Sequence, residues 1–276
     1  MFTRYVLCHY NKPMKATIAL LSDFGTEDHF AGVINGVIKN INPQADIIDL
    51  CHHIAPYDIL EGALLLKSSY RYFPKKTIFL TVVDPGVGTQ RKPIIMKTKD
   101  YTFVGPDNGI LSFVVAQNTR TKFYQIINER YFLMPISNTF HGRDIFAPVA
   151  AYISRGLPLR TFGPQLKSIT KINLPSPTIN KQRKEIIGEI IYSDRFGNLV
   201  TNIEEKHLER VGRVTTVRIK GRMIRGLNQN YSQTPAGKLL AITNSTKHLE
   251  ISLNQGSAKQ YLKAKKGERV TLSFKS

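Results

Sequence analysis

One stretch decides the fold, Thr77–Arg91, which reads Thr-Ile-Phe-Leu-Thr-Val-Val-Asp-Pro-Gly-Val-Gly-Thr-Gln-Arg. Its first seven residues are apolar or β-branched and carry no charge, a pattern typical of a strand buried on both faces of a parallel sheet. Asp84-Pro85-Gly86 then ends the strand abruptly, because these residue types favour turns. We therefore predict a carboxylate at the carboxyl end of a buried strand.

That end of a strand matters for function, because ligands of open α/β sheets bind outside the carboxyl ends of the strands. Arg91 follows Asp84 by seven residues, close enough for the loop to turn back. An acid and a base would then share one loop. The same residues also suit an ordinary turn, in which Asp84 closes the strand and Arg91 is solvated. The stretch alone leaves both interpretations open.

Upstream, Thr17–Leu21 is predicted to form a short buried strand, with Ser22–Thr26 as its exit loop. We expect Thr26 to cap the next helix, which would place Glu27 and Asp28 in the first turn, where the helix dipole favours acidic groups. The apolar residues that follow recur with helical spacing. This segment is the first strand-helix unit.

The second unit has a strand at Asp46–Leu50 and an apolar helix that Asp58 caps and that runs to about Phe73. Asp23 follows the strand of the first unit, as Asp84 follows the central strand. The alternation of strands and helices predicts a largely parallel sheet between helices. In such a sheet both carboxylates would lie at the same edge.

Beyond Arg91 we predict a hairpin between Pro93 and Val104, and a dense turn at Gly105–Gly109 near the same edge. The segment Thr139–Asp144 then opens another helix and places His141 just before its N-terminus. A histidine there could serve a site, or could simply hydrogen-bond a nearby carboxylate or backbone group.

The pattern of the sequence changes near residue 174, from alternating strands and helices to strands alone. We expect a catalytic α/β domain over residues 14–173, a linker over 174–184, and a smaller domain that is almost wholly β over 185–276. The second domain contains a turn, Ser193–Asn202, with aspartate and asparagine around an aromatic residue. Such a turn could stack and hydrogen-bond a flat heterocycle, or form an ordinary hairpin corner.

The formal net charge of +19 over 276 residues is the main compositional oddity. A surplus of this size would favour binding to nucleic acid or anionic membranes at low salt. However, most of the basic residues are scattered, and no RNA-binding aromatic motif or zinc finger accompanies them. We interpret the charge as a solvated surface and expect no specific nucleic acid as a partner.

Targeting and redox features point to a protein of the cytoplasm. No apolar run approaches the ~20 residues of a membrane span, and we interpret residues 1–13 as an extension, with Met14 as an alternative start. The two cysteines, Cys8 and Cys51, form no disulfide framework. Cys51 adjoins His52 and His53, but adjacent residues of a strand point to opposite faces, which argues against a metal site there.

The signatures of common enzyme classes, including the P-loop, GxGxxG, HExxH and GxSxG, are absent. What remains is a set of polar residues on loops at one predicted edge: Asp23, Asp28, Asp84, Arg91 and His141. Metal-dependent hydrolysis could use such a set, but Arg91 would repel the metal. Activation of water without a metal is the simpler interpretation, and we expect no metal site.

Five segments together resemble a known family: Ser22–Thr26, Val83–Thr89 with Arg91, Gly105–Gly109, Phe140–Asp144, and Asp194–Asn198 with Thr201–Ile203. They look like the S-adenosyl-L-methionine (SAM) hydroxide adenosyltransferases, the adenosine-forming SAM hydrolases related to the SAM-dependent fluorinase and chlorinase. The resemblance implies an α/β domain followed by a barrel-like β domain. It also implies a homotrimer whose SAM sites lie between the N-terminal domain of one subunit and the C-terminal domain of its neighbour.

The resemblance further implies roles for individual residues. Asp84, Arg91 and His141 match the water-activating trio, and the halogenases lack an acidic residue at the position of Asp84. The matched SAM contacts are Asp23 and Tyr57 for the ribose, Phe196 and Asn198 for the adenine, and Asp28, Asp194 and Ser245 for the methionine portion.

The expected function is hydrolysis of SAM to adenosine and L-methionine, by in-line attack of an activated water on the ribose C5′ carbon. SAM would be the substrate, and no cofactor is expected. The alternatives are a SAM-dependent halogenase, or a protein that binds SAM or nucleic acid without turnover.

Overall fold

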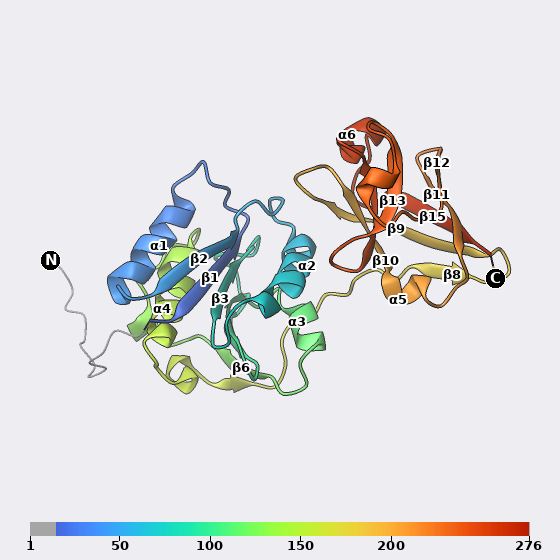
Figure 1. Cartoon of the computed structure of the whole chain (residues 1–276). Coiled ribbons are helices and arrows are strands. Elements are labelled where there is room, and N and C mark those ends of the chain that lie inside the picture. Colours follow the sequence, from blue (N-terminus) through green and yellow to red (C-terminus); the bar gives the residue numbers. More distant parts are fainter. Residues whose placement is uncertain (1–14, 276) are drawn as a thin grey trace. The chain divides into compact units, whose positions relative to one another are not determined.

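The computed structural model describes residues 15–275, and the chain divides between Asn173 and Leu174 into two compact units (Figure 1). The first unit is an α/β structure and the second is built mainly from antiparallel strands. The predicted fold class is therefore confirmed. The expected extension, residues 1–13, lies outside the described residues, and so does Cys8.

The first unit contains a seven-stranded sheet with strand order β2-β1-β3-β5-β4-β6-β7. The first four strands in that order are parallel, whereas β4, β6 and β7 run antiparallel to their neighbours. The predicted hairpin is confirmed as the pair β4 and β5. The strands are β1 (Thr17–Ser22), β2 (Asp46–Cys51), β3 (Ile78–Val82), β4 (Pro93–Lys97), β5 (Thr102–Pro106), β6 (Lys122–Gln125) and β7 (Gln165–Leu166).

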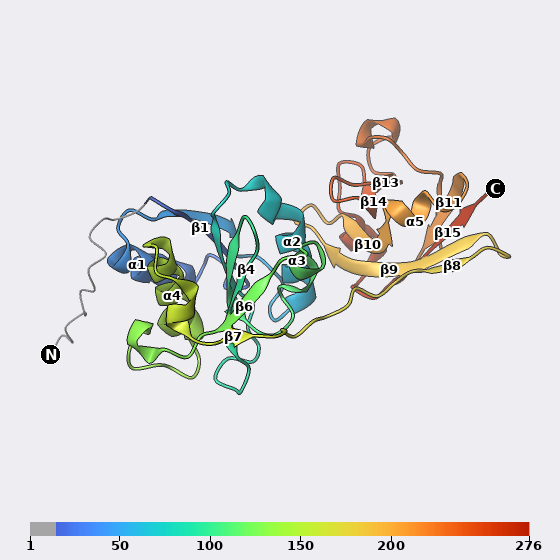
Figure 2. The same ribbon diagram turned by 90° about the horizontal axis from the view of Figure 1, so that it is seen from below.

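Helices cover both faces of this sheet (Figures 1 and 2). Along β3, Leu80 and Val82 pack into the core beneath α1 and α4, while Phe79 packs into the core beneath α2 and α3. This alternation confirms that β3 is buried on both faces, as its uninterrupted apolar sequence predicts. The helices are α1 (Phe30–Ile41), α2 (Ile59–Ser69), α3 (Ser112–Ala116) and α4 (Ala147–Ser154), with the shorter turns η1 (Tyr70–Tyr72), η2 (Glu129–Tyr131), η3 (Gly142–Phe146, a π-helix) and η4 (Leu159–Phe162).

The predicted start of α1 is wrong. The helix begins at Phe30, four residues after Thr26, and no side chain caps it. The ring of Phe24 lies 5.8 Å from that of Phe30 and 5.8 Å from that of Phe140, measured between centroids. These contacts between aromatic rings fold the intervening segment back as a loop. Asp28 consequently lies in this loop and not in the first turn of the helix.

The predicted start of α2 is confirmed, whereas α2 ends at Ser69, before the predicted end near Phe73, and the chain continues as the 3-10 turn η1. The Asp58 side chain caps α2 by accepting a hydrogen bond of 3.0 Å from the backbone N–H of Glu61. Helix α1 ends at Ile41, just before Pro43, which cannot continue it. Among residues 15–275, no helix has both the length and the apolar character needed to cross a bilayer.

The second unit is an eight-stranded antiparallel sheet that nearly closes on itself. Its strands follow the order β12-β11-β15-β9-β10-β14-β13, with β8 paired to β9. Near the two ends of that order, the N–H of Asn228 donates to the carbonyl of Ala241 at 2.7 Å. The strands are β8 (Thr178–Asn180), β9 (Glu185–Ser193), β10 (Leu199–Glu204), β11 (Val214–Ile219), β12 (Arg222–Arg225), β13 (Leu239–Thr243), β14 (His248–Leu253) and β15 (Arg269–Phe274).

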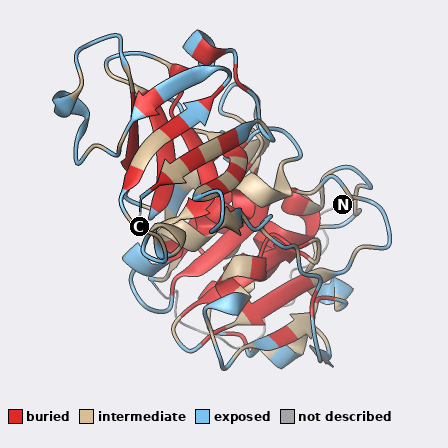
Figure 3. Ribbon diagram, turned by 90° about the vertical axis from the view of Figure 1, so that its right-hand side faces the viewer, coloured by how far each residue is buried: buried red, intermediate tan, exposed pale blue. Residues whose placement is uncertain are grey.

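Buried apolar residues of these strands form a separate core in the second unit (Figure 3). Two short strands were not expected: β12, and β8, which lies inside the predicted linker 174–184. Both are short and gain their hydrogen bonds from a neighbouring strand. Short helical segments complete the unit: α5 (Glu205–Leu208), η5 (Tyr231–Gln233) and α6 (Ala258–Leu262).

Candidate active site

The polar residues predicted at strand ends lie along one edge of the first sheet. Strands β1 and β3 are parallel neighbours, with Ser22 opposite Val82. Asp23 directly follows Ser22, and Asp84 follows Val82 by two residues. Adjacent strands lie about 4.8 Å apart, so the register puts both carboxylates at the same edge, as expected from the alternation of strands and helices.

Asp84, Arg91 and His141 are in direct contact. The Nε of Arg91 donates to Oδ1 and Oδ2 of Asp84 at 2.9 and 3.0 Å, and its Nη2 also donates to Oδ2. The same Nη2 donates to Nδ1 of His141 at 2.7 Å. Arg91 therefore bridges an acid and an imidazole that are separated by 57 residues in the sequence, the difference between positions 84 and 141.

The Asp84–Arg91 ion pair is almost completely shielded from solvent. The side chains of Asp84 and Arg91 are 5% and 9% exposed. The guanidinium carbon of Arg91 also lies 5.2 Å from the centre of the Phe146 ring, within the range of a cation–π contact. Such a pair is solvated only by its own hydrogen bonds, so either member alone would be an uncompensated buried charge. The alternative interpretation, a solvated Arg91 after an ordinary turn, is wrong.

The protonation state of His141 follows from its contact with Arg91. An arginine guanidinium has only donors, so Nδ1 of His141 must accept, and the proton of the neutral ring lies on Nε2. Burial, followed by the charge of Arg91, lowers the pKa of His141 from its ordinary value of 6.5. Both effects favour the neutral imidazole, and the carboxylates of Asp84 and Asp144 oppose them only in part.

The loop that carries Arg91 depends on a glycine. Gly88 has φ +75°, and a Cβ there would lie 2.3 Å from the carbonyl oxygen of Asn138. This close packing joins the Asp84–Arg91 loop to the segment just before His141. That segment is held in turn by the buried Asp144, whose Oδ2 accepts a 2.7 Å hydrogen bond from the N–H of Ser137.

The supporting roles of Gly88 and Asp144 were not among the predictions from the sequence. Gly88 lies in the segment Val83–Thr89 and Asp144 in the segment Phe140–Asp144. The residue types alone could have indicated their roles. A second glycine shortly after an Asp-Pro-Gly turn indicates a close backbone approach, and an aspartate after arginine at a helix start indicates a local hydrogen bond.

Asp23 and Tyr57 are also brought together. Oδ2 of Asp23 accepts a 2.9 Å hydrogen bond from the backbone N–H of Tyr57. Tyr57 adopts φ +68°, a conformation uncommon for tyrosine, and its side chain is 72% exposed. A strained residue that presents an exposed ring beside a carboxylate is a candidate ligand contact. Asp28 is exposed in the loop before α1.

The two histidines after Cys51 turn to different partners. His52 is buried, with Nδ1 2.6 Å from Oγ of Ser22. His53 is exposed, with Nε2 3.3 Å from Oγ1 of Thr26. Within the part of the chain that the structure describes, no group of three or more histidine, cysteine, aspartate or glutamate side chains is arranged to hold a metal ion.

The remaining predicted residues lie in the second unit. Asp194 and Asn198 close a turn, in which the carboxylate accepts hydrogen bonds of 2.9 Å from the backbone N–H and from Nδ2 of Asn198. Phe196, at the tip of this turn, is 78% exposed. A flat, exposed ring beside a fixed amide suits an aromatic ligand, although the turn is also a hairpin corner. Ser245 is exposed in the loop between β13 and β14.

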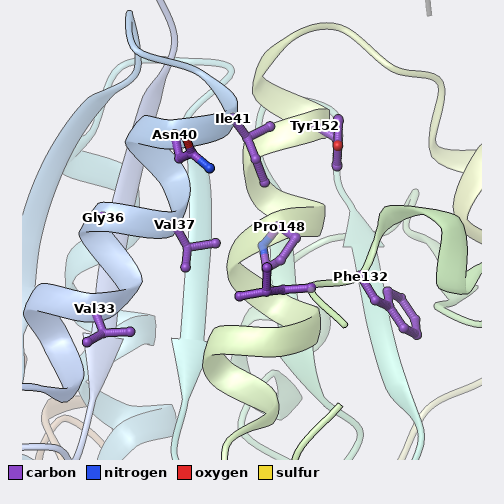
Figure 4. Close-up of a pocket in the computed structure, with 9 residues that line it drawn as sticks. Val33, Gly36, Val37, Asn40, Ile41, Phe132, Pro148 and Tyr152 are labelled. Carbon is purple, nitrogen blue, oxygen red and sulfur yellow. The ribbon is translucent and has the colours of Figure 1, made fainter. Parts of the chain in front are cut away.

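A cavity of about 310 Å³ lies elsewhere in the first unit, between α1 and α4 (Figure 4). Its lining is largely apolar and includes Val33, Val37, Ile41 and Pro148. None of the residues that line it is charged, and none belongs to the predicted site. The cavity therefore offers no carboxylate or imidazole that could take a proton from water.

Known proteins resemble the chain over most of its length. Models of the SAM hydroxide adenosyltransferase N-terminal and C-terminal domains match residues 18–163 and 188–271. An "(R)-S-adenosyl-L-methionine hydrolase" from Salinispora tropica is 32% identical over 263 residues, which cover 93% of this chain and 97% of that protein. A fluorinase from Actinoplanes sp. is 26% identical over 71% of this chain and 74% of its own length.

A solved structure is also similar to the chain over most of its length. The crystal structure of an uncharacterized conserved protein from Thermotoga maritima superposes with a TM-score of 0.84 at 38% identity, covering 93% of this chain and 99% of that one. The two family models together match both units, and the hydrolase is similar along nearly the whole chain. The chain therefore belongs to the SAM hydroxide adenosyltransferase family.

Proposed function

We propose that this protein hydrolyses SAM to adenosine and L-methionine by attack of water on the ribose C5′ carbon. The observation that carries the proposal is the buried contact between Asp84, Arg91 and His141 beyond the carboxyl ends of the parallel strands, where open α/β sheets bind their ligands. Relatives named as hydrolases of the same compound support the choice of substrate.

The chemistry requires little besides a nucleophile and its alignment. An O–C5′ bond forms while the C5′–S bond breaks, and the electron pair of the broken bond returns to sulfur. The leaving group is then a neutral thioether, which needs no general acid. The enzyme must hold water in line with the C5′–S bond and remove one proton from it.

The residues of the trio supply these needs. Asp84 is the proton acceptor, because His141 already uses Nδ1 to accept from Arg91 and carries its own proton on Nε2. From Nε2, His141 can donate to the attacking water and fix its orientation. Arg91 stabilises the negative charge that develops on the water oxygen, and its charge counts for more because the pair is buried.

Other residues would hold the substrate. Asp23 is assigned to the ribose hydroxyls and Tyr57 to the face of the ribose, and their contact supports a shared role. Phe196 and Asn198 are assigned to the adenine. The contacts to the methionine portion are assigned to three further residues: Asp28, Asp194 and Ser245.

We further propose that the active assembly is a homotrimer, in which residues of the N-terminal domain of one subunit meet those of the C-terminal domain of its neighbour. This arrangement follows from the family resemblance. Light scattering of the purified protein at low concentration tests it, because a trimer has three times the chain mass of 31.2 kDa.

A halogenase is less well supported, although a fluorinase is among the relatives. A halide that attacks C5′ would have to approach the buried carboxylate of Asp84, and like charges repel strongly in a poorly solvated site. Water, which is neutral and can donate its proton to a carboxylate, suits the site better.

The decisive experiment uses water labelled with oxygen-18. We expect the purified protein with SAM and a metal chelator to release adenosine and methionine, with the label in the 5′-hydroxyl of adenosine. Mass spectrometry of both products checks this. Label in neither product, or SAM returned unchanged, would overturn the proposal, and a chlorinated nucleoside formed with added chloride would favour the halogenase.

The state of His141 predicts how activity depends on pH. Its pKa lies below the ordinary 6.5, and protonation of Nδ1 would set an N–H against the donor of Arg91. We therefore expect kcat/KM to be constant near neutral pH and to fall tenfold per unit below the pKa of His141. A His141→Gln variant should be slower and should lack this acidic limb.

The stability of the fold should also fall as the pH drops. Because folding lowers the pKa of His141, the unfolded chain binds more protons between the folded and unfolded pKa values, and stability falls as pH drops through that window. Thermal unfolding of the wild type and of His141→Gln from pH 7 to 5 measures the difference. If the stability of His141→Gln falls between pH 7 and 5 as much as that of the wild type, the lowered pKa of His141 is not the cause.

A further inference from the structure

The turn Gly105–Gly109, at the end of β5, contacts both ends of the loop that carries Asp84 and Arg91. Strand β5 is the parallel neighbour of β3, so the turn lies next to the point where the chain leaves β3. Its two polar residues, Asp107 and Asn108, each make one hydrogen bond to an end of that loop. Neither residue has a role in the proposed function.

Asn108 holds the first end of the loop. Its Nδ2 donates a 2.8 Å hydrogen bond to the carbonyl of Val83, the residue directly before Asp84. Its Oδ1 accepts a 3.2 Å hydrogen bond from the N–H of Ile110, which fixes the orientation of the amide. Val83 is fully buried, so its carbonyl needs this partner because water cannot replace it.

Asp107 holds the second end. Its backbone N–H donates at 2.8 Å to the carbonyl of Lys92, the residue directly after Arg91. Its Oδ1 accepts a 2.7 Å hydrogen bond from the N–H of Thr170 and anchors the turn to another part of the unit. Asp107 contacts the loop through its backbone N–H, which most other residues could also provide. Asn108 contacts the loop through its side chain, so this contact depends on the residue type.

We propose that Asn108 is a positioning residue for water activation, which sets the direction in which the Asp84 carboxylate leaves β3. The inference rests on the proposed function. The carbonyl held by Asn108 belongs to the peptide bond that joins Val83 to Asp84. A rotation there moves Asp84 and, through their ion pair, Arg91. A displacement of about 1 Å at a reacting group can cost on the order of 100-fold in rate.

An asparagine elsewhere in the same unit provides a matched control. Asn128 donates from Nδ2 to the carbonyl of Thr161 at 2.9 Å, and its Oδ1 accepts at 3.3 Å from the N–H of Arg130, two residues later. Asn108 makes the same two kinds of hydrogen bond. Asn128 contacts no member of the trio in any hydrogen bond of the described residues.

The test compares Asn108→Asp with Asn128→Asp in the full chain. Each change replaces a donor by a carboxylate oxygen that faces a carbonyl. We expect Asn108→Asp to lower kcat by about 100-fold with little change in KM for SAM. It should also move the acidic limb of the pH profile. Asn128→Asp should keep the kcat and the pH profile of the wild type.

Loss of stability must be separated from loss of positioning. Thermal unfolding of both variants is measured first, and if Asn108→Asp does not fold, Asn108→Ala replaces it, because alanine removes the donor without adding a charge. A kcat reduced no more than in the matched Asn128 variant, with an unmoved pH profile, would overturn the inference.

Failure of the inference can be told apart from failure of the proposed function. An inactive wild-type protein would refute the proposed hydrolysis. The titration of His141, followed by NMR of labelled histidine, would still test the placement of the trio without any turnover. The His141 titration should shift in the Asn108 variant and not in the Asn128 variant. An identical titration in both would count against the positioning role.

Discussion

Replacement of Asp84 by alanine is expected to lower kcat for SAM hydrolysis by about a thousand-fold, the middle of the range for a positioned general base. SAM should still bind, because Asp84 is assigned to the water and not to the substrate. Single-turnover rates measure the loss of chemistry, and calorimetric titration with SAM measures binding. Loss of binding with normal turnover of the SAM that does bind would contradict this role.

Asp84→Asn is the companion variant, because alanine leaves the buried guanidinium of Arg91 without its partner. Asparagine has nearly the shape of aspartate, and its amide oxygen can still accept from Arg91. An amide cannot take up the proton of the attacking water. We expect Asp84→Asn to lose less stability than the alanine variant, because its amide oxygen still accepts from Arg91 although the charge of Arg91 is no longer compensated, and to be as slow as the alanine variant. Near wild-type turnover would exclude Asp84 as the base.

Replacement of Arg91 by methionine should have the second large effect, on stability as well as on rate. The side chains of Asp84 and Arg91 are 5% and 9% exposed, and removal of one partner leaves an uncompensated charge. Such a change typically destabilises a protein by about 3–5 kcal/mol. Chemical denaturation at neutral pH measures the loss, and turnover should fall because the developing hydroxide loses its cation.

A double variant separates the two consequences. Asp84→Leu combined with Arg91→Met replaces both charges by apolar groups of similar size, which is often neutral for stability. We expect the double variant to regain most of the stability lost by Arg91→Met, and to remain inactive. A double variant as unstable as the sum of the single ones would show that the two residues do not interact.

The local pattern of the sequence predicted much of the scaffold. The uncharged run in Thr77–Val83 indicates a strand buried on both faces, and β3 has this property. Asp58 was predicted to cap α2 and does so. These features depend on neighbours in the sequence: the spacing of apolar residues and the hydrogen-bonding capacity of a capping side chain.

Predictions failed where distant contacts outweigh local preference. Thr26 is a good capping residue, yet α1 begins at Phe30 because the rings of Phe24, Phe30 and Phe140 pack together. No pattern near Thr26 reveals a ring more than a hundred residues away. Strand β8 was overlooked for a similar reason, since three residues are too few to show a period and depend on β9 for their hydrogen bonds.

In the candidate site, too, local features could be predicted and distant contacts could not. The residues and their order were enough to indicate the family, the two kinds of domain, and an acid and a base, Asp84 and Arg91, in one loop after a buried strand. Three features became visible in the folded chain alone: Arg91 also donates to Nδ1 of His141, the Asp84–Arg91 pair is buried, and Gly88 packs on Asn138. The physical reason is that residue type and spacing encode local conformation, whereas these contacts depend on the order of strands in the sheet, which brings together loops far apart in the chain.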